Sequence, residues 1–414
     1  MVTCCIQICA EKTGIVMVPS MTSKVLAEAV KSKINEICHV VSANQEQLTS
    51  FGFSRGFLGV SVLNYLYSVH SGEPQYLNEA KLTFDKACEM IDGDPDKSYP
   101  QDFAELGVVC QYLYKAGVLD VVPNVFLEDI DAILLKKMRS ELAQNNIGGY
   151  VNGALGYGLY FLQRSYFDHD RMQHIIAELV HGIIENAIRT DKGCYWISRL
   201  KGNIESTYLT MPHGSAAIAL FLTRVAEMAL FPADQMKEII TQTIAFIELH
   251  RVQNQHYQFI DIVQDPHKSR LALCYGDMGI GYMLLRAGHV FDNSTWYQDG
   301  MALLRNCALR HEESNTGVQD ASILFGATGL ALMFDRIGRI TNDPLMKETS
   351  KFWYLKILEY DNAQNGYAGF RAANNQWHNH TNLAFSEGVI GIGCGLIKGL
   401  NPDNVDFDDL IWLL

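Results

Sequence analysis

The chain has 414 residues, of which 48% are hydrophobic and 19% charged, the balance of a globular protein with a large core. Its formal net charge is −13, from 46 acidic and 33 basic residues without a block of Lys or Arg, so the sequence argues against nucleic-acid binding and favours a cationic peptide over an anionic one as a partner. Ten scattered cysteines without framework spacing predict reduced thiols and a cytoplasmic location.

The first 23 residues differ from the rest of the chain. Glu11 and Lys12 interrupt their apolar run, and no basic region precedes a long hydrophobic one, so we predict an atypical N-terminal extension, 1–23, and no signal peptide. Helical patterning begins only near Lys24, which leaves Met17 and Met21 open as translation starts. No stretch reaches the length of a transmembrane helix.

From Lys24 onward, two kinds of helical segment alternate. In the first kind, apolar residues recur at helical spacing, which predicts amphipathic outer helices. These segments are 25–41, 79–90, 126–142, 169–189, 233–250, 296–309 and 342–359. Each is followed by a Gly-x-x-Gly step, or a variant of it, that leads into a more continuously apolar helix. The steps begin at Gly56, Glu105, Gly153, His213, Gly276, Gly326 and Gly388.

Such a repeat, at intervals of roughly fifty to sixty residues, predicts an array of helix pairs. Glycines let helix starts approach other backbone closely, so we expect the inner-helix starts to crowd together on one face. A closed ring suits this better than an open solenoid because it has no exposed terminal repeats. We therefore predict an all-α double-ring (α/α) barrel of about seven helix pairs, one domain over residues 24–414.

Three aromatic-rich segments precede inner helices, at 193–214, 256–270 and 365–388. They hold too many turn residues for helices, so we predict loops or short hairpins that reach the shared face. Trp196 and Trp377 within them are candidates to contact a substrate.

Two motifs on this repeated array resemble the lanthionine synthetase C-like family. They are His213-Gly214 before one inner helix and Cys274-Tyr275-Gly276 before the next. The resemblance covers nearly the whole chain after Lys24. It implies action on a ribosomally made peptide, in which zinc activates a cysteine thiol for addition to a dehydrated Ser or Thr. It also implies a precursor peptide and a peptide dehydratase as partners.

The zinc ligands that this resemblance implies are incomplete. Cys274 matches one, but Leu324 and Phe325 stand where a Cys and a His are implied. One thiolate cannot hold zinc, which needs about three protein ligands, so we expect the zinc to be lost. His378 and His380, two apart on a loop, are possible substitutes, although an ordinary polar pair explains them more simply.

Other positions of the family pattern are present. The resemblance gives His213 the role of an acid or base, with Arg270 and Tyr275 in support, and a His and an Arg could protonate and stabilise an enolate. Helix-start packing, a loop salt bridge and aromatic packing explain the three residues equally well or better. An Asp of the family pattern is replaced by Gly149.

Two functions therefore stay open: a metal-independent enzyme that uses His213 and Arg270, and a non-catalytic scaffold that binds a peptide. Asp277 and Glu387, beside inner-helix starts, are candidate substrate-binding residues and suggest a third, lesser alternative. Ring-shaped glycosidases use two carboxylates in this way, although the helix dipole explains both acids. The Asp-rich motifs of terpene cyclases are absent.

Overall fold

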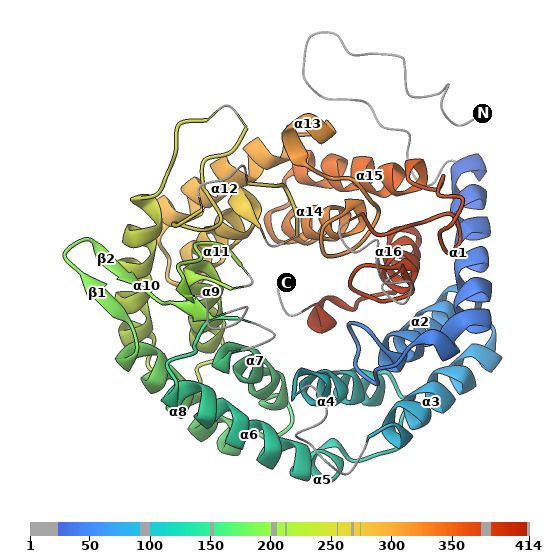
Figure 1. Cartoon of the computed structure of the whole chain (residues 1–414), viewed down its shortest axis with the longest axis horizontal. Coiled ribbons are helices and arrows are strands. Elements are labelled where there is room, and N and C mark those ends of the chain that lie inside the picture. Colours follow the sequence, from blue (N-terminus) through green and yellow to red (C-terminus); the bar gives the residue numbers. More distant parts are fainter. Residues whose placement is uncertain are drawn as a thin grey trace.

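The computed structural model describes residues 24–91, 100–149, 153–199, 205–211, 213–254, 256–265, 269–273, 275–373 and 382–411. These residues form two concentric rings of helices (Figure 1). In this part of the chain the outer ring consists of α1 (Lys24–Asn44), α3 (Pro74–Glu89), α6 (Glu128–Ala143), α8 (His169–Glu185), α10 (Ala233–Glu248), α12 (Ser294–Ala308) and α15 (Pro344–Glu359). The inner ring consists of α2 (Phe57–Ser71), α4 (Pro100–Lys115), α7 (Ala154–Arg164), α9 (Ser215–Glu227), α11 (Gly276–Val290), α14 (Ala327–Thr341) and α16 (Val389–Leu400). The predicted (α/α) double-ring barrel is confirmed.

The helices of the two rings are buried in different ways. Every residue of the inner helix α7 is buried, because other elements surround it. The outer helix α10 buries a stripe that includes Met236, Ile239 and Ile240, at the spacings of three and four that bring residues to one face. The hydrophobic core therefore runs around the molecule between the two rings, and the periodicity of the sequence reports which ring a helix belongs to.

The inner helices begin in a repeated way that explains their glycines. The preceding loop wraps around the helix start, and its carbonyl groups accept hydrogen bonds from the first helical N–H groups. Phe57 N donates to Ser50 O at 3.1 Å, and Ala327 N donates to Asp320 O at 3.0 Å. A Cβ on the N-cap residue Gly56 would lie 2.0 Å from Ser50 O. Since φ of Gly56 is −140°, the glycine provides space for the loop and not an unusual backbone angle.

The second glycine of a Gly-x-x-Gly motif also lies against the preceding loop, and substitution by alanine tests whether this contact requires a glycine. A Cβ at Gly329 would lie 1.8 Å from the backbone oxygen of Ile323, which cannot move as a side chain can. We expect Gly329→Ala to lower the free energy of unfolding by about 1–3 kcal/mol, measured by urea denaturation. Gly338→Ala, in the same helix, would bring its Cβ 2.9 Å from Lys347 Cγ, a milder contact with a side chain, so it should cost clearly less. Equal effects of the two substitutions would contradict this explanation.

Three predicted boundaries were wrong. Helix α3 begins at Pro74, five residues before the predicted start, because Pro fits the first helical turn. Helix α8 ends at Glu185 and not at Arg189, because the residues beyond it pair as a hairpin. Helix α4 begins at Pro100, so that Gly107, taken as a helix start, lies inside the helix.

The remaining elements are short. They are η1 (Gln45–Gln47), α5 (Pro123–Phe126), α13 (Glu313–Thr316), η3 (Asp408–Leu410) and the strands β1 (Ile188–Thr190), β2 (Gly193–Tyr195), β3 (Ser198–Arg199) and β4 (Glu205–Ser206). Strands β1 and β2 pair antiparallel, as do β3 and β4. The aromatic-rich segment before α9 therefore contains the short hairpin strands that the sequence left as one of two possibilities.

The first and last helix pairs close the ring. Helix α1 packs against α16 (Figure 1), and the Lys33 side chain forms an ion pair of 2.6 Å with Asp361, just after α15. At the helix starts, Ser386 N donates to Ser54 O at 3.1 Å. Side-chain and backbone contacts thus join residues more than 300 positions apart in the sequence.

The chain after α16 returns to the centre of the ring (Figure 1). Phe407 and Leu410 of this segment are buried. Asp408, 3% exposed, is paired with Lys398, Arg339 and, at 3.3 Å, Arg336, which lie in the later turns of α16 and α14. The segment therefore packs against the ends of inner helices opposite to their glycine starts.

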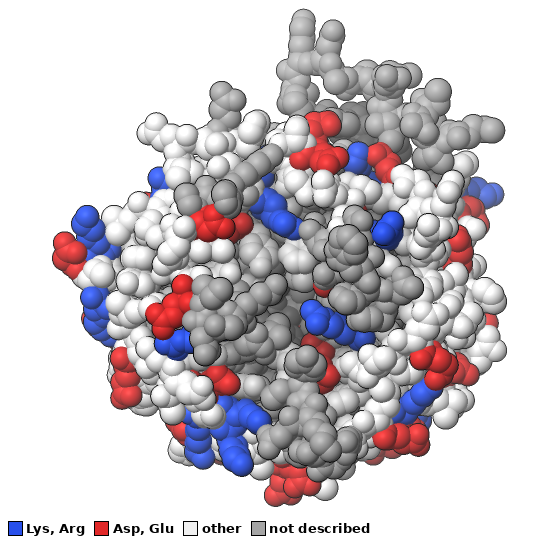
Figure 2. All heavy atoms as spheres, in the orientation of Figure 1, with Lys and Arg blue, Asp and Glu red and all other residues white. Residues whose placement is uncertain are grey.

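The surface and the helix lengths bear on possible partners. In the described part of the chain, no helix combines the length and apolar character required for a membrane span. On the face shown in Figure 2, acidic and basic side chains are interspersed, without a continuous basic area. On this face the two signs of charge are therefore mixed and not segregated.

Candidate functional site

The candidate site lies where α9, α11 and α14 begin, three consecutive helices of the inner ring (Figure 1). Arg270 and Tyr275 come before or at the start of α11, and Phe325 comes just before α14. The guanidinium carbon of Arg270 lies 5.1 Å from the centre of the Phe325 ring, and the ring centres of Tyr275 and Phe325 are 6.1 Å apart. The three side chains, all half-buried, thus form one aromatic and cationic cluster.

Leu324 is held by the backbone of a neighbouring loop. Its N–H donates to Ser386 O at 2.9 Å, and Ser386 N in turn donates to Ser54 O. These bonds connect the loops before α14, α16 and α2. The backbone at Leu324 and Phe325 is therefore fixed on one side by this chain of hydrogen bonds, and the Phe325 ring is fixed on the other side by Arg270.

His213 lies just before α9 and is half-buried. Its ring is 5.4 Å from the ring of Tyr208, in an edge-to-face arrangement. Its Nδ1 is buried without a hydrogen-bond partner among the described residues. Burial lowers the pKa of His213 from 6.5 to about 4, because the charged form loses its hydration. The imidazole is therefore neutral near pH 7.

This lowered pKa predicts how His213 affects stability. A His whose folded pKa is depressed contributes stability above its unfolded pKa of 6.5, and the contribution is lost as the pH falls towards 4. When the pH falls from 7 to 5, we expect the free energy of unfolding to drop by about 2 kcal/mol more in the wild type than in His213→Asn. Urea denaturation of both proteins at the two pH values measures this difference. Parallel pH dependence in the two proteins would show that His213 is solvated.

The structure corrects two expectations about substrate contact. Trp196 is 1% exposed, and its indole N–H donates to Ile183 O at 2.9 Å, so it packs in the core and offers no surface to a substrate. Asp277 is also 1% exposed, and its carboxylate accepts hydrogen bonds from the backbone N–H groups of Gln258 and Phe259 at 2.9–3.0 Å. Its role is to hold the loop before α11.

Glu387 is 4% exposed, so it does not face an open groove either. The structure thus gives no support to the lesser alternative, a pair of glycosidase carboxylates at Asp277 and Glu387. Four other candidates lie outside the described residues: Cys274, Trp377, His378 and His380.

Two residues near the site were not singled out from the sequence. Tyr208 contacts His213, and the Asp261 carboxylate accepts a hydrogen bond from Gly276 N at 2.9 Å. Both belong to aromatic-rich, strand-like segments. Neither has a fixed spacing from a motif, so no signal in the sequence separates them from other loop residues.

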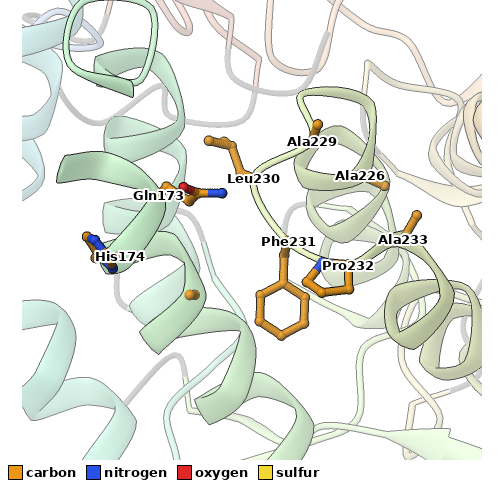
Figure 3. A pocket seen from close by; sticks show the side chains of 9 residues that line it. Gln173, His174, Ala226, Ala229, Leu230, Phe231, Pro232 and Ala233 are labelled. Carbon is orange, nitrogen blue, oxygen red and sulfur yellow. The ribbon is translucent and has the colours of Figure 1, made fainter. Parts of the chain in front are cut away.

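Two cavities in the described structure lie away from this cluster. One, of about 550 Å³, lies between α8 and the turn from α9 to α10 and is lined by Gln173, His174, Leu230, Phe231 and small residues (Figure 3). The other, of about 330 Å³, lies between α12 and the start of α15. Neither is lined by a candidate site residue.

Comparisons with known proteins identify the family of the chain and agree with its fold. The family described as lanthionine synthetase C-like protein matches residues 120–411. The chain belongs to this family. Among solved structures, nisin cyclase is similar over 93% of this chain and 98% of its own, with a TM-score of 0.70 and 14% sequence identity, a likeness in fold. D-mannose isomerase is similar over 70% and 85%, with a TM-score of 0.42 and 12% identity. No curated protein matches the sequence.

A lanthionine synthetase C-like protein would hold zinc at this site, but the described residues do not fit the metal. Leu324 and Phe325 carry no donor atom. The Phe325 ring, moreover, lies against the cationic guanidinium of Arg270. Among the described residues, no group of three or more His, Cys, Asp or Glu side chains could hold a metal ion. An aromatic and cationic cluster therefore stands where the family resemblance places two zinc ligands.

Gly149 stands where the family resemblance implies an Asp, and its backbone conformation also differs from the one that an Asp would adopt. Gly149 has φ 115°, a conformation that residues with a side chain rarely adopt. The adjacent Gly148 lies against His213, since a Cβ there would be 2.6 Å from His213 O. The loop at Gly149 is thus next to His213, but an Asp placed there would be strained.

Proposed function

We propose that this lanthionine synthetase C-like protein acts in the modification of a ribosomally made peptide, as a component that binds the precursor and not as a zinc-dependent cyclase. Family membership supports the peptide as ligand. The observation that carries the second part is the contact of Arg270 with Phe325, at the place where zinc would need a donor.

The partners follow from the same proposal. The net charge of −13 favours a cationic precursor segment, and a dehydratase that prepares the peptide is the natural second partner. We place the protein in the cytoplasm. The cysteines of the described residues, Cys38, Cys88, Cys110, Cys194, Cys307 and Cys394, are all free thiols, as a reducing compartment maintains them.

A specific observation favours a second candidate, metal-independent thiol addition. The buried Nδ1 of His213 has no partner among the described residues, so a neutral imidazole could take the proton of a peptide thiol. The sulfur would then bond to the β-carbon of a dehydrated residue, and His213 would return the proton to the α-carbon of the resulting enolate. A histidine with a pKa of about 4 is a weak base near pH 7, which favours the binding function.

One experiment separates the two candidates. A fluorescein-labelled synthetic peptide with one dehydroalanine and one cysteine is titrated with the protein, and Kd is measured by anisotropy. Loss of the free thiol is followed in the same samples by reaction with a disulfide reagent. We expect binding without acceleration of thiol loss over the peptide alone.

The variant His213→Ala gives the matching control. Thiol loss that the wild type accelerates and His213→Ala does not, at unchanged Kd, would overturn the binding function in favour of the enzyme. No binding of this peptide, or of a version with unmodified Ser, would contradict both candidates.

A further inference from the structure

Asp261, in the loop between α10 and α11, contacts two segments that carry candidate site residues. Its main-chain oxygen accepts a hydrogen bond from Leu209 N at 3.0 Å. Its side-chain Oδ1 accepts hydrogen bonds from Ser269 Oγ and Gly276 N, both at 2.9 Å. One half-buried residue is therefore bonded both to the segment before α9 and to the turn that begins α11.

The first of these segments positions His213. Ser215 N donates to Tyr208 O at 3.1 Å and Ala216 N to Leu209 O at 3.0 Å, so residues 208 and 209 are fixed to the first turn of α9. The Tyr208 ring also lies against the His213 ring. A movement of Leu209 would therefore move the walls around His213.

The second segment positions Arg270 and Tyr275. Gly276 has φ 60°, and a Cβ there would lie 2.3 Å from Ser269 Oγ and 2.9 Å from Arg270 O. The chain thus turns back tightly between Ser269 and Gly276, and the Asp261 carboxylate bonds both ends of this turn. Arg270 and Tyr275 extend from the two ends of the turn onto Phe325.

We propose that Asp261 is the positioning residue of this site, which holds the His213 segment and the Arg270–Tyr275 turn in one fixed arrangement. Its two side-chain hydrogen bonds set the turn, and its backbone bond ties the turn to Leu209. The consequence of this positioning role for peptide binding rests on the proposed function. The effect of Asp261 on the geometry of the unliganded protein does not.

The environment of Asp261 agrees with this role. Burial raises the pKa of its carboxyl to about 6, and the bonds from Ser269 and Gly276 and the charge of Arg270 oppose that rise. Glu105 is comparable, since it is buried and accepts bonds from Phe53 N and Ser54 N at 2.6 and 2.9 Å. It joins only α4 to the loop before α2, so it serves as a matched control.

The test uses the full chain without peptide and measures amide hydrogen exchange in Asp261→Ala, Asp261→Asn and Glu105→Ala. We expect exchange at Gly276 to rise at least about tenfold in Asp261→Ala, the change expected from loss of one hydrogen bond. Exchange at Leu209 should also rise, because the backbone oxygen that accepts its hydrogen bond is no longer held by the side chain of residue 261. Asp261→Asn keeps an acceptor oxygen and should restore both. Glu105→Ala should affect only residues near Phe53. Asp261→Ser, too short to reach Gly276 N, replaces Asp261→Ala if the latter does not fold.

A second readout is the pKa of the His213 ring, measured by nuclear magnetic resonance. This pKa would not change if Asp261 held only the turn before α11. We expect the pKa of His213 to rise from about 4 towards 6.5 in Asp261→Ala, because the walls around the ring loosen. Unchanged exchange at Gly276, or faster exchange at Gly276 alone with Leu209 and His213 unchanged, would overturn the proposal.

Peptide binding is measured separately with the labelled dehydroalanine peptide. We expect Kd to rise about tenfold in Asp261→Ala and to recover in Asp261→Asn. If the wild type does not bind the peptide, the proposed function fails while the exchange data still decide the role of Asp261. If the wild type binds and Asp261→Ala binds equally well, the positioning role fails alone.

Discussion

The double replacement Leu324→Cys with Phe325→His is expected to give a protein that binds about one zinc per chain, where the wild type binds almost none. The two new side chains would join Cys274 as three ligands with an open fourth position. The replacement also removes the Phe325 ring that Arg270 now contacts. Elemental mass spectrometry on protein purified without chelators or a metal-affinity tag measures the zinc.

Leu324→Ala with Phe325→Ala is the matched control, since it removes the same two apolar side chains and adds no ligand. A folded double variant without zinc would show that these two positions do not correspond to the family's ligands. One zinc per chain in the wild type would reveal substitute ligands, with His378 and His380 the first to replace, and would restore the cyclase function.

The substitution Asp131→Ala is expected to lower the free energy of unfolding by about 3–5 kcal/mol. Asp131 in α6 pairs with Arg164 in α7 at 2.9 Å, and both side chains are fully buried. Its carboxylate also accepts a hydrogen bond from Tyr160 at 2.5 Å and pairs with Arg171 of α8 at 3.2 Å. Removal of Asp131 would leave a buried guanidinium without its counter-charge. Urea denaturation measures the loss.

Asp129→Ala is the control, because Asp129 is an exposed carboxylate on the same helix, and we expect a change within about 0.5 kcal/mol. Asp131→Leu combined with Arg164→Met should recover most of the loss, because it removes both charges. A loss below about 1 kcal/mol in Asp131→Ala would mean that water reaches Arg164.

The ring was predictable because its causes are local and repeated. A stripe such as Met236, Ile239 and Ile240 identifies an outer helix at any position in the chain. The glycine at the start of every inner helix except α4 recurs because the same loop must pass the same place in each of these units, as Ser50 passes Gly56. Repetition turns weak signals into one strong signal. It also explains why Gly107, inside α4, was misread as one more start.

Individual side chains were predicted less well. Trp196 and Asp277 were taken for substrate contacts because their types and positions allow it, but both are buried by residues from other segments. Whether an aromatic or acidic loop residue faces inward depends on what packs over it. A spacing pattern holds no information about that packing.

The sequence alone predicted the architecture and the family resemblance, because both are visible in residue types along the chain. That resemblance also implies two zinc ligands at the positions of Leu324 and Phe325. Only the tertiary structure decided that Phe325 contacts Arg270 and that His213 is half-buried with a lowered pKa. It also placed Asp261 against both Leu209 and Gly276. The contacts of Phe325 with Arg270 and of Asp261 with Leu209 join residues about fifty positions apart, and the packing of neighbouring helix pairs, not local pattern, brings them together.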